Sequence, residues 1–379
     1  MKKLIKYLKR MGIAIILLVL AFVLGSAMFI NYYPSFGGDV TKDLQAKYTN
    51  SKNFRDGAFV NQKNVPEDLG FWETLKLARK FFFTKVPNGV PRQHIEVQSV
   101  DSAQVADYRG ETRLIWFGHS AFLLQIEGKN ILIDPMFSEV PAPHPMLGGK
   151  RFSKALPLAV EQLPAIDAVI LSHDHYDHLD YESILKLKDR VKHYYTPLAV
   201  GVHLKAWGIK EDQITELDWW QNTRLGDLEF VCAPAQHFSG RKLGNRQSTL
   251  WSSWVIRSAS ESIFFSGDSG YGPHFKEIGE KYGPFNFAMM ECGQYNESWP
   301  DIHMFPEETV QAGVDVKAKM VMPIHWGAFK LALHSWTDPV ERAQLKAKEL
   351  NIPLLTPEIG QPIHIDTVQS PNKTWWSEL

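Results

Sequence analysis

A short apolar segment followed by closely spaced polar side chains constrains this chain more than any other feature. Residues Ala168 to Leu171 are apolar and favour a short buried strand. Three histidines and an aspartate follow within six positions: His173, His175, Asp177 and His178. Imidazole nitrogens and carboxylate oxygens are donors that zinc and similar divalent metals prefer, and a loop at a strand end can direct them to one point. The pattern predicts a metal site rather than a surface loop that is histidine-rich by chance.

The same arrangement recurs three times later in the chain. Apolar strands are expected over residues 228–233, 262–266 and 319–322, and the polar residues that follow them are His237, Asp268 and His325. Each of these alone is more often a hydrogen-bonded residue at a strand end. Strand ends at one edge of a sheet converge, however, so all seven side chains are expected to meet. Seven donors suit two divalent ions, and a bridged pair ~3.5–4 Å apart activates a water and binds phosphoryl oxygens.

Length and composition indicate a folded protein that does not bind nucleic acid. The chain has 379 residues, 44% of them hydrophobic, which is enough for one large domain or two smaller ones. A net charge of −1 argues against a broad basic surface for nucleic acid. The two cysteines, Cys232 and Cys292, cannot form a disulfide framework or a C-x-x-C zinc site, and their apolar neighbours predict buried thiols.

The N-terminus has the composition of a membrane segment. Residues 11–30 contain no charged side chain and are long enough to cross a bilayer. The charged side chains before them are all cations, so the N-terminus is expected in the cytoplasm and the rest of the chain outside it. A cleaved signal peptide, giving a secreted or periplasmic protein, is the alternative, because Gly25-Ser26-Ala27 offers small residues for cleavage. An uncleaved anchor is favoured because the apolar run continues to Ile30.

We divide the chain into three parts. Residues 1–30 are the membrane anchor or signal segment, 31–109 a linker and N-terminal extension, and 110–379 the main domain. Within the extension, residues 71–83 predict a helix with aromatic residues and cations. This helix would lie on a membrane surface or pack on the main domain. A loop over residues 141–157, rich in proline and glycine, is long enough to form a lid.

The motifs of the main domain resemble those of the metallo-β-lactamase superfamily, whose α/β fold is an αββα sandwich of two mixed β-sheets flanked by helices. Within it they resemble the zinc phosphodiesterases that hydrolyse N-acyl-phosphatidylethanolamine, which are phospholipases D by reaction type, and their bacterial membrane-associated relatives. The resemblance extends from about residue 110 to 365. It rests on Trp116-Phe-Gly-His119, Leu132-Ile-Asp-Pro135, Ser172-His-Asp-His-Tyr-Asp-His-Leu-Asp-Tyr181, Glu216-Leu-Asp-Trp-Trp220, Ala235-Gln-His237, Gly267-Asp-Ser-Gly-Tyr271, Pro306-Glu-Glu308 and Ile324-His-Trp-Gly327.

The resemblance implies a site with two Zn²⁺ ions, although nitrogen and oxygen ligands also accept iron or manganese. One zinc would be held by His173, His175 and His237, the other by Asp177, His178 and His325, with Asp268 bridging them. His303 matches an active-site histidine of that family. Asp134 and His119 are expected to support the ligands rather than bind metal.

The implied function is a membrane-associated phosphodiesterase that converts an N-acyl-phosphatidylethanolamine-type phospholipid to phosphatidic acid. Asp177 or Asp268 would orient or deprotonate the nucleophilic water, and His303 would contact the phosphate or assist the leaving group. The expected partners are a phospholipid or another phosphodiester, and a membrane through residues 11–30. Two alternatives stay open: a metal-dependent hydrolase of a soluble ester, lactone or phosphoester, and a metal-binding envelope protein without turnover.

The chain departs from the lipid-hydrolysing family near the expected site. Where that family has Pro-Ile-Gly-Ala-Tyr, this chain has Glu291-Cys-Gly-Gln-Tyr295. Gly293 and Tyr295 match, whereas Glu291 and Cys292 do not. An acidic group at this position is expected to change which head group is accepted.

Overall fold

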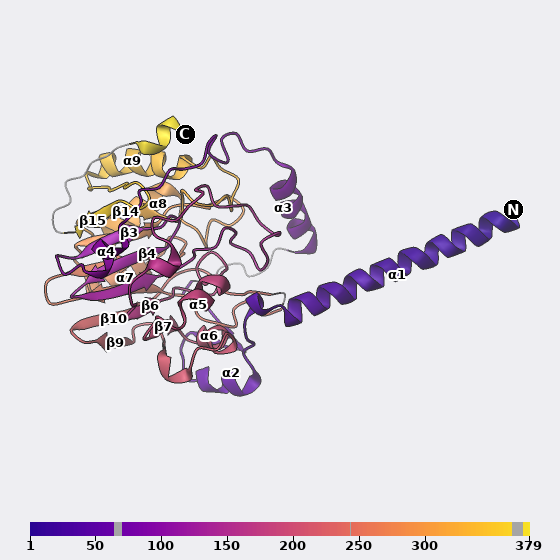
Figure 1. The fold of residues 1–379 in the computed structure, drawn as a ribbon, viewed down its shortest axis with the longest axis horizontal. Helices are drawn as coiled ribbons and strands as arrows, with labels where there is room; N and C mark the ends of the chain where they lie inside the picture. The colour runs from indigo at the N-terminus through magenta and orange to yellow at the C-terminus, as the bar shows by residue number, and fades with distance from the viewer. Residues whose placement is uncertain (64–69, 243, 366–373) are drawn as a thin grey trace.

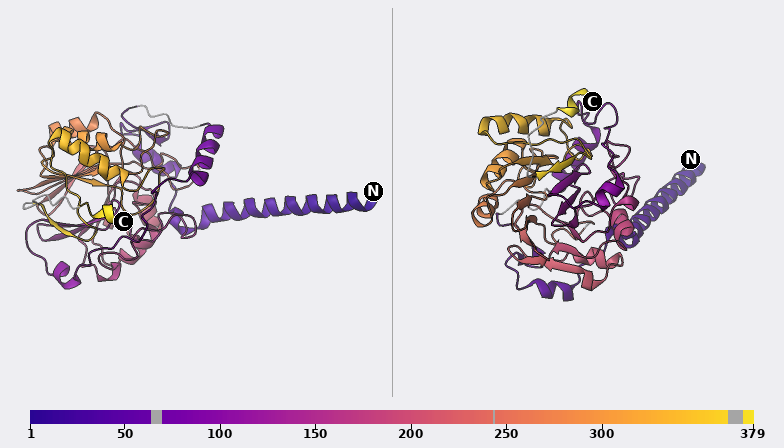
Figure 2. Two further views of the ribbon diagram at one scale, coloured as in Figure 1. Left: turned by 90° about the horizontal axis from the view of Figure 1, so that it is seen from above. Right: turned by 60° about the vertical axis from the view of Figure 1, so that its left-hand side comes forward.

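Two mixed β-sheets packed face to face form the body of the protein, and helices cover both outer faces (Figures 1 and 2). This is the αββα arrangement that the resemblance implies. The structure is a computed structural model, and it describes residues 1–63, 70–242, 244–365 and 374–379.

The first sheet has seven strands in the order β15-β3-β4-β5-β6-β7-β8. The pairs from β15 to β5 are antiparallel, whereas those from β5 to β8 are parallel. The strands are β3 (Arg113–Trp116), β4 (Phe122–Ile126), β5 (Lys129–Ile133), β6 (Ala168–Ile170), β7 (Tyr194–Pro197), β8 (Ile214–Leu217) and β15 (Pro362–His364). The short strand β6, which precedes the histidine-rich loop, lies between two parallel neighbours and is buried throughout.

The second sheet has six strands in the order β14-β13-β12-β11-β10-β9. Strands β9 to β12 form antiparallel pairs, and β12, β13 and β14 run parallel. The bounds are β9 (Asn222–Leu225), β10 (Leu228–Ala233), β11 (Ser253–Arg257), β12 (Ser262–Phe265), β13 (Phe287–Glu291) and β14 (Val321–Ile324).

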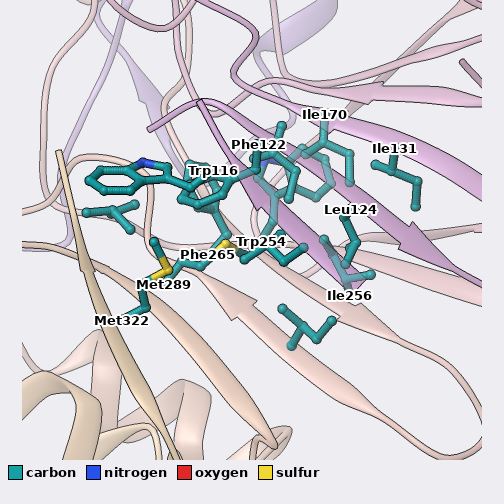
Figure 3. Packing of buried hydrophobic residues seen from close by; sticks show 14 of the residues in the cluster. Trp116, Phe122, Leu124, Ile131, Ile170, Trp254, Ile256, Phe265, Met289 and Met322 are labelled. Atoms are coloured by element: carbon teal, nitrogen blue, oxygen red, sulfur yellow. The ribbon is translucent and has the colours of Figure 1, made fainter. Parts of the chain in front are cut away.

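Apolar residues on both faces of the strands explain why the sheets are covered on both sides. Successive side chains of a strand point to opposite faces. On β3, Leu114 and Trp116 therefore join the cluster between the sheets, whereas Ile115 packs under the outer helices. Figure 3 shows part of the cluster between the sheets, with Trp116, Phe122, Leu124, Ile131, Ile170, Trp254, Ile256, Phe265, Met289 and Met322 labelled. The buried thiols of Cys232 and Cys292 agree with the sequence prediction.

Helices complete the two outer layers. Residues of α5 and α6 pack on the outer face of the first sheet, and residues of α7, α8 and α9 on that of the second. Their bounds are α4 (Ser102–Ala106), α5 (Tyr181–Leu187), α6 (Gly201–Ala206), α7 (His274–Lys281), α8 (Pro306–Asp315) and α9 (Asp338–Leu350). Single 3₁₀ turns are η2 (Val160–Gln162), η3 (Glu211–Gln213) and η5 (Trp375–Glu378).

The N-terminal part begins with an exposed helix, α1 (Lys2–Tyr32), which projects from the domain and buries no residue (Figure 1). By length and composition, α1 can cross a membrane. It is followed by η1 (Pro34–Phe36), α2 (Lys42–Tyr48), the hairpin β1 (Phe54–Arg55) and β2 (Ala58–Phe59), and α3 (Phe71–Phe83). The extension is packed on the domain, because Tyr48, Phe54 and Phe59 belong to the cluster between the sheets.

Candidate metal centre

The residues that the sequence predicts as metal ligands lie together at one end of the sandwich. The first four follow β6 in the seven-stranded sheet. His237, Asp268 and His325 follow β10, β12 and β14 of the six-stranded sheet. The strand ends therefore converge as expected, but the ligands come from two sheets rather than from one sheet edge.

The first group consists of three histidines and an aspartate. Nδ1 of His175 lies 2.9 Å from Nε2 of His173 and 3.2 Å from Nε2 of His237. Oδ2 of Asp268 lies 3.9 Å and 3.8 Å from the same two Nε2 atoms. One donor atom from each of the four residues lies within 4.8 Å of all the others.

The second group forms around Asp177 and shares Asp268 with the first. Nε2 of His325 lies 3.2 Å from Oδ2 of Asp177 and 3.1 Å from Oδ2 of Asp268. Nε2 of His178 lies 3.6 Å from Oδ2 of Asp177 and 3.1 Å from Oδ1 of Asp268. The Asp268 carboxylate thus faces both groups, as a bridging ligand would.

The chemistry of these donors fits two metal ions. Ligands 2.0–2.1 Å from a tetrahedral zinc lie roughly 3.3 Å from one another, close to the separations here. The facing imidazole nitrogens of His173 and His175 need a shared proton or cation, because two lone pairs repel. Nε2 of His178 and Oδ1 of Asp268 are buried and make no hydrogen bond. A cation would give both atoms a partner, as buried polar groups require.

Neighbouring groups fix which imidazole nitrogen faces the centre. Asp134 accepts a hydrogen bond from Nδ1 of His178 at 2.7 Å and another from the backbone N–H of Ser172 at 2.7 Å. Nδ1 of His237 donates to the carbonyl of Ile302 at 2.9 Å. These bonds leave each Nε2 as the nitrogen available to a metal. Asp134 therefore has the supporting geometry that the sequence predicts.

His119 also lies against the second group. Its Nε2 is 2.8 Å from Oδ2 of Asp177, and its ring centroid is 4.1 Å from that of His325. Burial, together with nearby His325, lowers the pKa of His119 to about 3 despite the Asp177 carboxylate. A neutral His119 can donate one hydrogen bond and thereby orient Asp177, which fits a supporting role.

The protonation states differ between the two groups in the metal-free protein. Burial and neighbouring histidines hold the pKa values of His173 and His237 well below the ordinary range. Burial also acts to lower the pKa of His178, but the carboxylates of Asp268 and Asp177 outweigh it and raise the pKa to about 10. Although burial acts to lower it, the pKa of His325 is likewise raised well above its ordinary range by Asp268 and Asp177. The first group is therefore neutral at its histidines near pH 7, whereas the second carries protons on His178 and His325.

The backbone around His325 is constrained by a close approach. His325 has a positive φ of 67°, which is unusual for a residue with a side chain. A Cβ atom at Gly293 would lie 2.0 Å from the carbonyl oxygen of His325. Only glycine fits at position 293, which accounts physically for the Gly293 match in the motif.

His303 is brought to the centre, although sequence alone would assign it to a loop. Its ring centroid lies 5.0 Å from that of His237 and 5.4 Å from that of His325. Its Nδ1 is 2.9 Å from Oε1 of Glu291, which is completely buried. Nε2 of His303 is thus the ring nitrogen left to meet a substrate.

One residue of the N-terminal extension, Asn61, supports the centre although no sequence pattern predicts it. The Asn61 side chain donates to the carbonyl of His237 at 2.7 Å and accepts from its N–H at 3.0 Å. Asn61 also accepts a hydrogen bond from the indole of Trp251 at 3.0 Å. No motif marks Asn61, because its role depends on a contact across 176 positions of sequence.

Known proteins share both the sequence pattern and the fold. The sequence model named "Beta-lactamase superfamily domain" matches residues 129–326. An uncharacterised protein of Mycobacterium tuberculosis is 39% identical over 337 residues, covering 87% of this chain and 89% of that protein. The N-acyl-phosphatidylethanolamine-hydrolyzing phospholipase D 1 of Caenorhabditis elegans is 32% identical over 240 residues, covering 59% of this chain and 67% of that protein.

A solved structure supports the fold assignment. The isothiocyanate hydrolase from Delia radicum gut bacteria matches with a TM-score of 0.53 at 24% identity. The match covers 67% of this chain and 98% of that chain.

Proposed function

This chain belongs to the metallo-β-lactamase superfamily of metal-dependent hydrolases, and we propose that it is a membrane-anchored phospholipid phosphodiesterase of the phospholipase D type. The observation that carries the proposal is that the Asp268 carboxylate faces both donor groups, because two adjacent metal ions suit phosphodiester hydrolysis. The similarity to the Caenorhabditis elegans phospholipase favours an N-acyl-phosphatidylethanolamine-type substrate.

We assign one metal to His173, His175 and His237 and the other to Asp177, His178 and His325, with Asp268 bridging, and zinc is the expected ion. When bound, the two ions supply a water of lowered pKa and neutralise charge on the phosphoryl oxygens. Asp177 or Asp268 would orient that water or accept its proton. His303, held at Nδ1 by Glu291, offers Nε2 to the phosphate or to the leaving oxygen.

Product analysis with the full-length protein tests this function. Zinc-loaded protein in detergent micelles would be offered N-acyl-phosphatidylethanolamine, phosphatidylethanolamine and phosphatidylcholine side by side. We expect metal-dependent release of phosphatidic acid, and none from the His175→Ala variant. The matched control is His193→Ala, because His193 bonds to Thr215 on β8, outside the centre.

The alternatives give different results in the same assay. Hydrolysis of a soluble phosphodiester, ester or lactone without release of phosphatidic acid would replace the lipid substrate and keep the hydrolase. Two bound metals without turnover of any substrate would indicate a metal-binding envelope protein. Full activity of His175→Ala would contradict the assignment of the site.

We also propose that α1 is retained as an anchor, with the N-terminus in the cytoplasm and the catalytic domain outside it. The continuous α1 helix and its apolar surface support this topology. The intact mass of the protein purified from membranes tests retention. A mature chain that begins near Ala27 would instead indicate cleavage of a signal peptide.

A further inference from the structure

The junction between α1 and the domain is fixed by several contacts. Trp207 donates through Nε1 to the carbonyl of Pro34 at 2.8 Å, and Arg241 donates to the carbonyl of Ser35 at 2.7 Å. Phe36 is buried, and its ring lies against that of Tyr176. These contacts therefore fix the orientation of the domain relative to α1, which a flexible linker would not do.

This junction lies directly beside the candidate metal centre. Tyr176 stands between His175 and Asp177 in the ligand loop. The Arg241 guanidinium, buried over the Tyr176 ring, also donates to the carbonyls of Asp174 and Leu179 in that loop. A bilayer that contains α1 would thus end close to the ligand loop.

The 143–148 loop lies against the same end of α1. The ring of His144 is 5.5 Å from that of Tyr33 and 6.2 Å from that of Phe29. The hydroxyl of Ser35 donates to the carbonyl of Pro143 at 2.6 Å. Beyond these contacts, Met146 is 85% exposed and Leu147 is 57% exposed. Two apolar side chains are therefore presented to the surroundings where the membrane segment ends.

Helix α3 projects from the same side of the domain as α1 and runs across its direction (Figures 1 and 2). A helix in this position lies along a bilayer that α1 crosses. Trp72, Leu75 and Phe83 are 75%, 51% and 81% exposed, and their spacing places them on one helical face. The cations on the same face or beside it are exposed: Lys76, Arg79 and Lys80.

The segment before α3 contacts residues at the centre, and the segment after α3 contacts the main domain. Before it, Asn61 holds His237, and Lys63 forms an ion pair with Asp301, next to Ile302, which holds the His237 ring. After it, the side chain of Asn88 donates to Ser335 at 3.0 Å.

We propose that α3 and the 143–148 loop form a second bilayer contact, which seats the metal centre on the surface of an anionic phospholipid membrane. The proposal rests on the membrane anchoring in the proposed function. Aromatic and aliphatic side chains enter the boundary between head groups and acyl chains, while lysine and arginine reach anionic head groups. α3 carries three such cations against one carboxylate, Glu73.

Site-specific fluorescent labels on the full-length protein in nanodiscs test this contact. Cys232 and Cys292 are buried, so a cysteine introduced by Trp72→Cys, Phe83→Cys or Met146→Cys is labelled selectively. We expect these labels to be quenched by lipids spin-labelled near the head group and protected from aqueous iodide. Protection should be stronger in anionic discs than in phosphatidylcholine discs.

Two further positions make failure of the contact distinguishable from failure of anchoring. Leu345→Cys, on α9 far from α1, is the exposed control and should be quenched by iodide (Figure 1). Leu18→Cys, within α1, should be quenched by lipids spin-labelled in the acyl chain. The label at Leu18→Cys can be quenched by the acyl-chain spin labels while iodide quenches the labels at positions 72 and 83 as strongly as the label at position 345. This result would refute the second contact and support the anchor. Quenching of the label at position 18 by aqueous iodide would refute both the anchor and the second contact.

A functional comparison completes the test. The triple variant Trp72→Ser, Leu75→Ser and Phe83→Ser should hydrolyse phospholipid in anionic vesicles severalfold more slowly, with an unchanged rate on a soluble phosphodiester. Equal rates on vesicles for the variant and the parent protein would overturn the proposal. If no substrate is hydrolysed, the proposed function fails, and the labelling result decides the membrane contact alone.

Discussion

Oε1 of Glu291 lies 2.9 Å from Nδ1 of His303, and the Glu291 side chain has no exposed surface. Its other oxygen, Oε2, accepts the backbone N–H of Met304 at 3.0 Å. The carboxylate therefore lies beneath His303 rather than in the space open to a substrate. Oε1 also lies 3.6 Å from Nδ1 of His325. The expected influence of Glu291 on head-group choice would therefore act through His303 and His325 rather than through direct contact with the substrate.

The variant Glu291→Gln tests this coupling. Glutamine keeps the size of the side chain but removes the charge that holds His303, so we expect kcat to fall about 10- to 100-fold. KM and the metal content should change less, which separates loss of His303 orientation from loss of the centre. Glu307→Gln, which breaks a partly exposed ion pair with Arg342, is the control. Unchanged turnover in Glu291→Gln would show that His303 needs no carboxylate partner.

Asp134→Asn should weaken the second metal site. Asp134 accepts hydrogen bonds from Nδ1 of His178 and from both the N–H and the hydroxyl of Ser172, and an amide nitrogen would oppose one of these donors. We expect one metal per chain rather than two after dialysis, with affinity reduced about 10- to 100-fold. Metal analysis measures the change, and Asp167→Asn at the far end of β6 is the control. Retention of two tightly bound metals would contradict the role of Asp134.

Metal affinity should depend on pH differently at the two sites. Burial lowers the pKa of His178, but the carboxylates of Asp268 and Asp177 outweigh it and raise the pKa to about 10. Despite burial, the same two carboxylates raise the pKa of His325 well above its ordinary range. A metal at the second site must therefore displace two protons near neutral pH, and its affinity should rise by up to about a hundredfold per pH unit between pH 7 and 9. The first site should vary little above pH 7, because burial holds the pKa values of His173 and His237 low.

Chelator competition at pH 7, 8 and 9 measures both affinities. Thermal unfolding of the metal-free protein tests the protonation of His178 independently. A histidine whose pKa is raised in the folded state stabilises the fold at pH values below its pKa in the unfolded state. The contribution of His178 should thus be complete below about pH 6.5 and be lost as the pH rises through 10. Equal pH slopes for the two metals would contradict these protonation states.

Local patterns predicted the strands that carry the metal ligands. The apolar runs over 168–171, 228–233 and 262–266 correspond to β6, β10 and β12 with bounds that differ by at most one residue, and the run over 319–322 corresponds to β14 with a shift of two residues. The prediction of a helix over 71–83 is confirmed by α3. Helix α9 was not predicted, because its buried side is built from Pro339, Val340, Ala343 and Ala347, and small residues give little periodic signal.

The site was predictable where its ligands are close in sequence and less so where they are not. The loop from His173 to His178 carries its own signal, because four donors follow one buried strand. His303 needed the family resemblance, since nothing in its neighbourhood predicts the contact with Glu291. The contacts of Ser35 with Arg241 and of Phe36 with Tyr176 could not be predicted from the sequence, because they join segments that are far apart in the chain.

Asn61→Ala tests whether the N-terminal extension belongs to the metal centre. The variant removes two hydrogen bonds to the backbone of His237 and one from Trp251. Each bond to His237 is worth about 0.5–1.5 kcal/mol net, and the Trp251 indole keeps its hydrogen bond to the carbonyl of Ala235. The loss of the two bonds to His237 should therefore lower the free energy of unfolding by about 1–3 kcal/mol. Because His237 also loses its positioning, affinity at the first metal site should fall while the second site keeps its affinity.

Urea unfolding and chelator competition measure the two effects of Asn61→Ala, and Asn222→Ala on the exposed strand β9 is the matched control. A loss of stability without a change in affinity at the first site would mean that Asn61 only joins the extension to the domain. A selective loss at that site would mean that the extension orients a ligand. Residues 31–109 would then be part of the catalytic unit rather than a linker between the anchor and the hydrolase.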